Sequence, residues 1–208
     1  GNKTRKLEYL VAAAQEAGAD TLVTVGGIQS NHARQTAAAA AKFGLSCELI
    51  LEDVEGTPKQ HYYTNGNLLL DQVLGAHINY VPANIAQENF TSSLIEELSS
   101  NGRKPYLIPM GGSNTIGALG YVRCAGEILS QLSSQELDID TIVLATGSAG
   151  TQAGLLAGLI AEQSNIQVLG FCVSRNGEEQ QALVADLLEQ TLTMIGLDPA
   201  LATGRVFA

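Results

Sequence analysis

Three cations stand within the first six residues of the chain: Lys3, Arg5 and Lys6 in the stretch GNKTRKLEYL. The N-terminus of a helix carries roughly half a positive charge, so cations are disfavoured there. Either the helix begins after these residues, or an anion belongs beside them. A lysine amine can also bond covalently to a carbonyl carbon, which gives this stretch a second kind of chemistry.

A second stretch, ATGSAGTQAG at 145–154, offers a loop that can bind an anion. Its small residues follow an apolar run and let successive backbone N–H groups approach one phosphate, with hydroxyl groups as further donors. The loop matches neither the dinucleotide fingerprint nor the P-loop. The alternative is a tight turn that serves only helix packing. The residues that would form the phosphate loop are Gly147, Ser148, Ala149, Gly150 and Thr151.

A third stretch, VGGIQSNHARQ at 25–35, places polar side chains directly after another apolar run. Ser30 or Asn31 can cap the helix that follows and still turn a hydroxyl or an amide toward a ligand. The alternative is a strand, a turn and a well-capped helix without further function. His32 by itself is more often a histidine of a capped helix than a catalyst.

A glycine-rich stretch, PMGGSNTIGALG at 109–120, interrupts the pattern near the middle of the chain. Glycines between a strand and a helix permit backbone turns that other residues resist, so this stretch predicts a hinge between two domains. The same residues can line a cleft, and the two interpretations are compatible.

The elements that must position these loops alternate along the chain. Strands are predicted at the apolar runs 21–25, 47–52, 78–82, 105–109, 141–146 and 166–173. Helices are predicted at 5–17, 31–43, 59–74, 89–101, 116–132, 150–162 and 177–195. Strands that are apolar on both faces and alternate with helices are typical of parallel sheets covered by helices. The sequence therefore predicts an α/β fold, in which the loops between strands and helices bind ligands.

The composition of the 208 residues suits a globular protein with a substantial core, since 45% are hydrophobic and 15% charged. The net charge of −10 argues against nucleic acid or an anionic membrane as a partner, because both select basic surfaces. Any anionic ligand must therefore be held by local groups. No apolar run reaches the roughly 18 residues that span a bilayer, and no signal peptide is visible.

Three cysteines, Cys47, Cys124 and Cys172, lie in apolar surroundings, and none belongs to a C-x-x-C pair. This pattern predicts reduced structural thiols rather than a disulfide framework, and no metal site is expected. Reduced thiols in turn favour the cytoplasm as the location of the protein.

A phosphate loop without a nucleotide motif, together with a lysine beside a glycine, points to pyridoxal phosphate. This cofactor needs a lysine for a Schiff base, a dipolar cup for its phosphate and a polar partner for its ring oxygen. Lys3, the 146–151 loop and Asn31 are candidates for these three roles. The alternatives are a solvated lysine without function and a nucleotide-dependent dehydrogenase, against which the missing dinucleotide fingerprint argues.

Five stretches, in this order along nearly the whole chain, carry a family resemblance: GNKTRKLEYL, GGIQSNHARQTAAAAAKFGL, YYTNGNLLLDQVLGA, GRKPYLIPMGGSNTIGALGYV and ATGSAGTQAG. Together they resemble the D-cysteine desulfhydrase and aminocyclopropane-carboxylate deaminase family, which has the tryptophan-synthase-β-like fold (fold type II) of pyridoxal-phosphate enzymes. The resemblance implies two three-layer α/β/α domains with parallel sheets, at 1–115 and 116–208. It also implies a chain incomplete at both termini, with apolar surface left uncovered where further strands would follow.

The resemblance assigns roles to individual residues. Lys3 matches the lysine that forms the Schiff base and moves the substrate proton, and Lys6 matches a lysine close to the phosphate. Ser30 and Asn31 match residues near the substrate carboxylate and the cofactor's ring oxygen, and Ser30 is expected to take part in catalysis. The backbone of 147–151 looks like the phosphate cup. The anion expected beside the first helix is then the cofactor itself.

The resemblance further implies a lyase that eliminates the thiol of D-cysteine and gives pyruvate, ammonia and hydrogen sulfide. His32 stands where deaminases of the family carry glutamine, which favours the desulfhydrase and places His32 at the edge of the substrate site. The alternatives are aminocyclopropane-carboxylate deaminase, a cysteate sulfo-lyase, and a protein or fragment that binds a ligand without catalysis. The family habit implies a homodimer that acts on a small amino acid.

Overall fold

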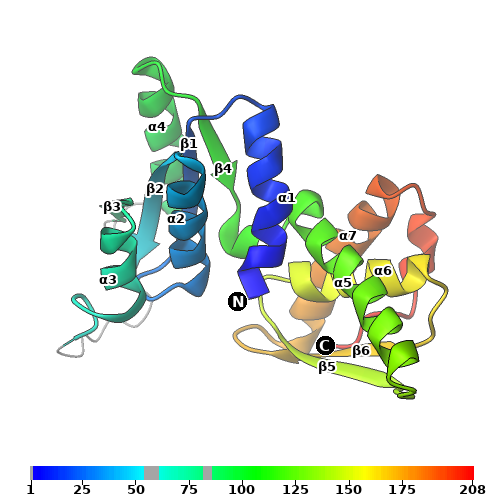
Figure 1. Cartoon of the computed structure of the whole chain (residues 1–208). Helices are drawn as coiled ribbons and strands as arrows, with labels where there is room; N and C mark the ends of the chain where they lie inside the picture. Colours follow the sequence, from blue (N-terminus) through cyan, green and yellow to red (C-terminus); the bar gives the residue numbers. More distant parts are fainter. Residues whose placement is uncertain (1, 54–60, 82–85) are drawn as a thin grey trace. The chain divides into compact units, whose positions relative to one another are not determined.

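The computed structural model describes residues 2–53, 61–81 and 86–208. Its strands alternate with helices along the chain (Figure 1), and the strand pairs among the described residues are parallel. The predicted α/β class is therefore confirmed. The chain divides into two compact units. The N-terminal unit consists of Lys3 and residues 10–112, and the C-terminal unit of Asn2, residues 4–9 and residues 113–208.

The N-terminal unit is built on a four-stranded parallel sheet. Its strands are β1 (Thr21–Gly27), β2 (Ser46–Glu52), β3 (His77–Tyr80) and β4 (Pro105–Ile108), in the spatial order β3-β2-β1-β4. Strand β1 is paired on both sides, and its successive side chains Leu22, Val23 and Thr24 are fully buried. Because successive side chains of a strand point to opposite faces, both faces of this sheet are covered at β1.

Within the described residues, four helices and one short turn of 3₁₀-helix accompany these strands. They are α1 (Asn2–Glu16), whose residues are shared between the two units, α2 (Asn31–Phe43), α3 (Gly66–Val73), α4 (Gln87–Ser100) and η1 (Met110–Gly112). Helix α2 has the bounds that the sequence predicts. It begins after Ser30, whose side chain caps it, and ends at Gly44, where a φ of 69° requires a residue that tolerates the left-handed region.

The C-terminal unit contains a two-stranded parallel sheet and three helices. They are β5 (Thr141–Thr146), β6 (Gln167–Cys172), α5 (Thr115–Ser134), α6 (Gly150–Ala161) and α7 (Gly177–Met194), followed by the 3₁₀-helix η2 (Pro199–Ala202). Helices α5 and α6 pack closely, since a Cβ atom added at Gly154 would lie 2.4 Å from the carbonyl oxygen of Ala118. The glycines of α6 thus permit the contact that supports this helix and the loop before it.

The two-stranded sheet is covered on one face only. Val168 is fully buried, whereas Val143, Phe171 and Val173 on the opposite face are 59%, 61% and 65% exposed. Val143 pairs with Leu169, which is also exposed, so these residues share one apolar face. The expectation of uncovered apolar surface is confirmed for this sheet.

The predicted helix at 59–74 is wrong at its start. Residues 61–65 form turns, and α3 begins only at Gly66, because the side chain of Asn65 accepts a hydrogen bond from the Gly66 amide and so caps the helix. The sequence does mark this boundary, since Thr64, Asn65 and Gly66 are typical of a turn. Residues 59 and 60 of that prediction, and residue 82 of the strand predicted at 78–82, lie outside the described residues.

The glycine-rich stretch 109–120 is a loop only in its first half. Helix α5 begins at Thr115, because the side chain of Asn114 caps it by accepting from the Gly117 amide. The glycines at the start of α5 serve packing instead, since a Cβ atom at Gly120 would lie 2.1 Å from the carbonyl oxygen of Arg5. Among the described residues, no helix is long and apolar enough to cross a membrane.

Candidate active site

The loop between β1 and α2 is held by its own polar side chains. Ser30 has an extended backbone (φ −67°, ψ 121°), and its Oγ accepts from the amide of Ala33 at 3.2 Å. Its backbone amide donates to the carbonyl of Gly27 at 2.9 Å, which closes the turn. Asn31, the first residue of α2, is exposed. The sequence-based prediction that Ser30 or Asn31 caps this helix is therefore confirmed for Ser30.

Hydrogen bonds of the Gln29 side chain hold the start of α3 against this loop. The side chain of Gln29 donates to the backbone carbonyls of Tyr62 and Asn65, at 2.6 and 3.0 Å, and accepts from the amide of Asn67 at 2.9 Å. Gly66 between them has a φ of 66°, and a Cβ atom there would lie 2.5 Å from Gln29 Oε1. Only glycine therefore fits this position, and its neighbour Asn67 reaches the loop.

Asn67 is a residue that the sequence analysis did not single out. Its Nδ2 donates to the backbone carbonyl of Gln29 at 2.8 Å and to Oδ1 of Asn31 at 3.0 Å. The available clue was its place in the motif YYTNGNLLLDQVLGA, where an Asn-Gly-Asn sequence stands at the start of a helix. A turn explains that composition equally well, so the pattern alone does not distinguish the two roles.

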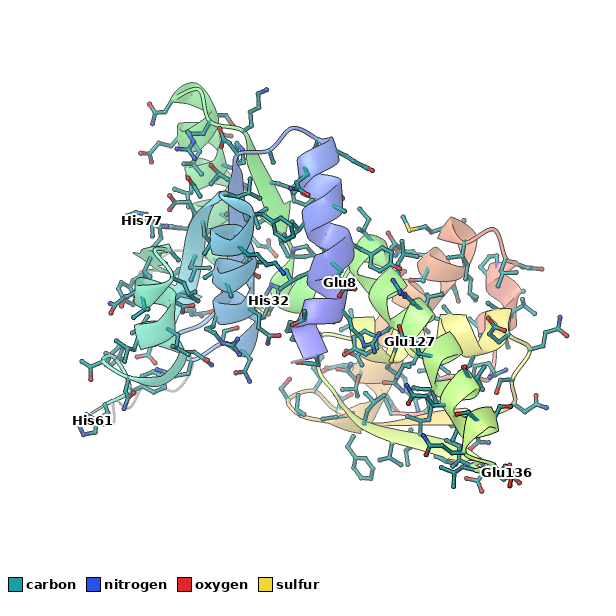
Figure 2. The ribbon with its side chains drawn as sticks, viewed as in Figure 1. Glu8, His32, His61, His77, Glu127 and Glu136 are labelled. Atoms are coloured by element: carbon teal, nitrogen blue, oxygen red, sulfur yellow. The ribbon has the colours of Figure 1, made fainter. Side chains whose placement is uncertain are left out.

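His32 lies on α2 (Figure 2) with its ring turned into the N-terminal unit. It is 4% exposed, and its Nε2 lies 2.9 Å from the hydroxyl of Thr24. That hydroxyl donates its only proton to the carbonyl of Ile108 at 2.8 Å, so Nε2 of His32 must be the donor in the first contact. His32 therefore ties α2 to β1 and β4. Its predicted contact with substrate stays a prediction.

The cations at the start of the chain lie inside a helix. Because α1 begins at Asn2, the alternative that the helix starts after them is wrong. Burial lowers the pKa of Lys3, since desolvation disfavours its ammonium form, and a neutral amine is the nucleophilic form. Arg5 is used elsewhere: its guanidinium donates to Glu127 at 2.7 Å, which raises the pKa of Arg5.

Lys6 is buried completely and reaches the loop after β5. Its Nζ donates to Oγ of Ser113 at 2.9 Å, and that hydroxyl donates to Oγ of Ser148 at 2.9 Å. The amide of Gly150 also donates to Ser113 Oγ, at 3.3 Å. Lys6, Ser148 and Gly150 were predicted from the sequence to bind the cofactor, whereas Ser113, 107 positions from Lys6, was not. This group of residues, Lys6, Ser113, Ser148 and Gly150, is called the α6 cradle below.

Helix α6 begins without a side-chain cap. Its N-cap residue is Ala149, whose φ of 66° and ψ of −38° are unusual for a residue with a side chain, and the amide of Gly150 donates to the carbonyl of Ser148 at 2.8 Å. A Cβ atom at Gly150 would lie 2.7 Å from Ser113 Oγ and 2.9 Å from Lys6 Nζ. The helix end, the buried amino group of Lys6 and two hydroxyls thus converge where a side chain at position 150 would displace them, an arrangement that suits an anion.

The structure brings the predicted residues together in two groups. Ser30, Asn31 and His32 belong to the N-terminal unit, which also includes Lys3. Lys6 and the 147–151 loop belong to the C-terminal unit, where the α6 cradle is formed.

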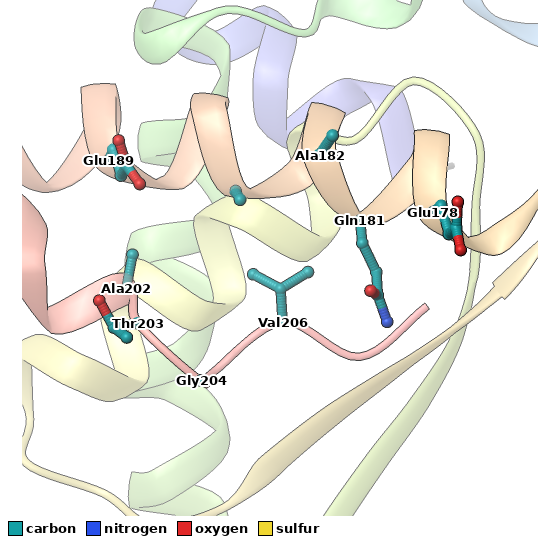
Figure 3. Close-up of a pocket in the computed structure, with 9 residues that line it drawn as sticks. Glu178, Gln181, Ala182, Glu189, Ala202, Thr203, Gly204 and Val206 are labelled. Carbon is teal, nitrogen blue, oxygen red and sulfur yellow. The ribbon is translucent and has the colours of Figure 1, made fainter.

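Several other polar or hollow features of the described residues lie outside both groups. The three cysteines are free, and burial raises the pKa of Cys47 to about 12, so its thiol stays protonated. A pocket of about 350 Å³ lies against α7 and the segment 202–206 (Figure 3), and none of the predicted site residues lines it. Asp71 of α3 is fully buried without a hydrogen-bond partner, and burial raises its pKa to about 7.

Comparison with known proteins decides the family. Residues 1–204 match the family described as pyridoxal-phosphate dependent enzyme. The chain belongs to this family. It is 44% identical over 202 residues to D-cysteine desulfhydrase of Yersinia pestis (strain Pestoides F), which covers 97% of this chain and 61% of that relative. It is 45% identical over 197 residues to D-cysteine desulfhydrase of Yersinia enterocolitica serotype O:8 / biotype 1B, covering 95% and 59%.

Among solved structures, the chain resembles one described as an ACC deaminase homologue. The two share 40% sequence identity with a TM-score of 0.84, over 95% of this chain and 58% of the other. The predicted fold type II is therefore confirmed, and with it the family's cofactor, pyridoxal phosphate. The chain spans about three-fifths of the length of the curated relatives it matches.

The α6 cradle fits the phosphate of this cofactor in its chemistry. A phosphate needs several donors and a compensating positive charge, and it gains both from a helix N-terminus with a neighbouring lysine. The cradle supplies the hydroxyls of Ser113 and Ser148, the buried amino group of Lys6, which a bound phosphate would keep protonated, and a glycine whose replacement would crowd these groups.

Proposed function

We propose that the protein is a pyridoxal-phosphate dependent lyase that converts D-cysteine and water into pyruvate, ammonia and hydrogen sulfide. The α6 cradle carries the proposal, because its buried lysine and its helix end without a side-chain cap suit the phosphate of the family's cofactor. The identity of 44% to D-cysteine desulfhydrases supports this choice of substrate.

In this proposal the C-terminal unit holds the cofactor's phosphate. Lys6 contributes its positive charge, and Gly147, Ser148, Ala149, Gly150 and Thr151 present the backbone and hydroxyl donors before α6 and in its first turn. When bound, pyridoxal phosphate withdraws electrons from the α-carbon of an attached amino acid, which stabilises the charge left when a proton departs. The protein's part is to bind, to orient and to move that proton.

Lys3 has two tasks in the proposed reaction. Its amine would hold the cofactor at its aldehyde carbon and would be free again once substrate is bound. The released amine then accepts the proton from the α-carbon. The lowered pKa of Lys3 supports both tasks, because a neutral amine is needed for each.

The loop before α2 is proposed to receive the substrate and the ring. Ser30 lies near the substrate carboxylate, where it also takes part in catalysis, and Asn31 donates to the cofactor's ring oxygen. Since the ring of His32 is 4% exposed and engaged with Thr24, we propose that His32 affects the choice of substrate through the position of this loop.

We further propose the setting in which this enzyme works. The two domains are 1–115 and 116–208, the enzyme is a homodimer in the cytoplasm, and its substrate is a small amino acid. The free cysteines support the cytoplasm, and the net charge of −10 supports the expectation that it binds neither nucleic acid nor an anionic membrane.

A substrate panel tests the proposal. The intact protein is loaded with pyridoxal phosphate, and 2-oxo acid and sulfide are measured with D-cysteine, L-cysteine, L-cysteate and aminocyclopropane-carboxylate. We expect turnover dominated by D-cysteine with equal amounts of pyruvate and sulfide. The identity of 40% to an ACC deaminase homologue makes the deaminase the second candidate, and turnover dominated by the cyclopropane substrate would replace the proposal with it.

A variant separates the enzyme from a protein that only binds a ligand. Lys3→Ala should remove the visible absorption band of the bound cofactor and abolish turnover, because no other lysine is proposed to bond to the aldehyde. A wild-type protein that binds pyridoxal phosphate but shows neither band nor turnover with any of the four compounds would favour a binding role.

A further inference from the structure

The side chain of Asn67 has three polar partners in the N-terminal unit. Its Nδ2 donates to the backbone carbonyl of Gln29 at 2.8 Å and to Oδ1 of Asn31 at 3.0 Å. Its Oδ1 accepts from Nε of Arg34 at 3.3 Å. Asn67 therefore stands between a cation and the side chain that is proposed to meet the cofactor's ring.

Two of these partners fix which end of the Asn67 amide is nitrogen. A guanidinium group only donates hydrogen bonds, so the atom that faces Arg34 must be oxygen. A backbone carbonyl only accepts, so the atom that faces Gln29 must be nitrogen. The orientation of the Asn67 amide follows from its neighbours and needs no further assumption.

The orientation of Asn31 follows in turn. The nitrogen of the Asn67 amide can only donate, so Asn31 must present its oxygen to it. The NH₂ group of Asn31 is then turned away from Asn67, at the exposed start of α2. A side chain that could present either a donor or an acceptor thus presents a donor.

We propose that Asn67 is a positioning residue that makes Asn31 a donor toward the ring oxygen of pyridoxal phosphate. This proposal rests on the proposed function, which places that oxygen beside Asn31. The ring oxygen is an acceptor when ionised, so an amide NH₂ stabilises it and an amide oxygen repels it. Arg34 strengthens the arrangement, because a cation at the end of a chain of hydrogen bonds polarises each bond after it.

Two substitutions of Asn67 should change the orientation of the Asn31 amide to different degrees. Asn67→Ala removes the partner that orients Asn31, so its amide turns freely. Asn67→Asp keeps the shape but offers only acceptors, so the NH₂ group of Asn31 turns to the new carboxylate and its oxygen faces the ligand. The aspartate variant should therefore be worse than the alanine variant, although it is closer in shape to the native residue.

The test compares pyridoxal phosphate with 3-deoxypyridoxal phosphate, which lacks the ring oxygen. Affinities are measured for the intact protein and its variants. We expect Asn67→Ala to weaken binding of pyridoxal phosphate roughly tenfold and Asn67→Asp on the order of 100-fold, the size of a hydrogen bond to a charged group lost or reversed. Binding of the deoxy compound should change less than about twofold. The absorption maximum of bound pyridoxal phosphate should shift in the aspartate variant.

Asn65→Asp is the matched control. It places the same charge two positions away, and aspartate can still accept from the Gly66 amide that Asn65 caps. Both affinities should stay close to those of the wild type. Unchanged binding of the deoxy compound by the Asn67 variants also shows that they are folded.

Equal losses of both ligands, or an aspartate variant that binds pyridoxal phosphate as well as the alanine variant, would overturn the role of Asn67 and leave the proposed function standing. A wild-type protein that binds neither ligand would overturn the proposed function, and this proposal with it.

Discussion

The two loops that carry the predicted residues differ in how the backbone amides at the start of the following helix are satisfied. Both follow a parallel strand and precede a helix. The loop before α2 satisfies the helix end with its own side chain, since Ser30 accepts from the amide of Ala33. The loop before α6 supplies no side-chain cap, and its N-cap residue is Ala149 with a positive φ.

This difference separates a helix end that its own loop caps from one that we propose to bind an anion. A helix end capped from within keeps its amides occupied and presents side chains to whatever binds. A helix end without a side-chain cap, beside the buried amino group of Lys6, can be completed by a bound anion, which would also favour the charged form of this lysine. Changes at the two loops should accordingly have different consequences, one for stability and the other for affinity.

The largest effect is expected at Gly150. In Gly150→Ala the new Cβ atom would lie 2.7 Å from Ser113 Oγ and 2.9 Å from Lys6 Nζ, so the α6 cradle must open. We expect the affinity for pyridoxal phosphate, followed by cofactor fluorescence, to fall at least about 100-fold, the equivalent of one lost charged contact. Gly126→Ala on α5 is the control, because its nearest neighbour would be 3.9 Å away. Similar affinities in the two variants would contradict the cradle.

Asp71, a buried residue of α3, should make the free energy of unfolding depend on pH. Its folded-state pKa of about 7 lies above its value near 4 in an unfolded chain. As pH rises between these values, the unfolded state releases the proton first, so stability decreases up to pH 7 and then stays level. Between pH 5 and 7 this contribution is on the order of 2 kcal/mol.

The Asp71→Asn variant isolates this contribution. Urea unfolding of both proteins at pH 5, 6, 7 and 8 gives the difference in free energy at each pH, which cancels the other titrating groups. We expect the free energy of unfolding of the asparagine variant to rise relative to that of the wild type from pH 5 to 7. Parallel pH profiles would mean that the carboxyl group is already ionised at pH 5 in the folded protein, in conflict with its complete burial.

The smallest effects compare the two serines directly. Ser30→Ala should reduce the free energy of unfolding by about 1 kcal/mol, because α2 loses its cap. Ser148→Ala should change it by less than about 0.5 kcal/mol, since Ser148 caps no helix, but should weaken binding of pyridoxal phosphate several-fold. Chemical denaturation and cofactor titration of both variants give these values. Equal losses in the free energy of unfolding would contradict the distinction between the two loops.

Much of the fold was predictable because it depends on local pattern. The strand at 141–146 has the predicted bounds, as does α2 at 31–43, since apolar runs and a serine cap are visible in a short window of sequence. The start of α3 was missed, although Thr64, Asn65 and Gly66, which are typical of a turn, mark it in the sequence.

The site was predictable only in part, because some of its contacts join residues that are far apart in the sequence. Glycines and hydroxyls next to a strand identify a loop such as 147–151 from its own composition. Ser113 and Asn67 act on residues 107 and 36 positions away, so their partners exist only once the chain has folded. The burial of Lys6 belongs to the same class, because nothing in its local sequence distinguishes it from an exposed lysine.

The most direct test of the α6 cradle is its preference for phosphate. Affinities for pyridoxal phosphate and for pyridoxal, which lacks the phosphate, are measured in the wild type, Lys6→Met and Ser30→Ala of the intact protein. We predict that the wild type strongly prefers pyridoxal phosphate, that Lys6→Met loses most of this preference, and that Ser30→Ala keeps it. A preference that survives in Lys6→Met, or that falls equally in Ser30→Ala, would contradict the assignment of the phosphate to α6.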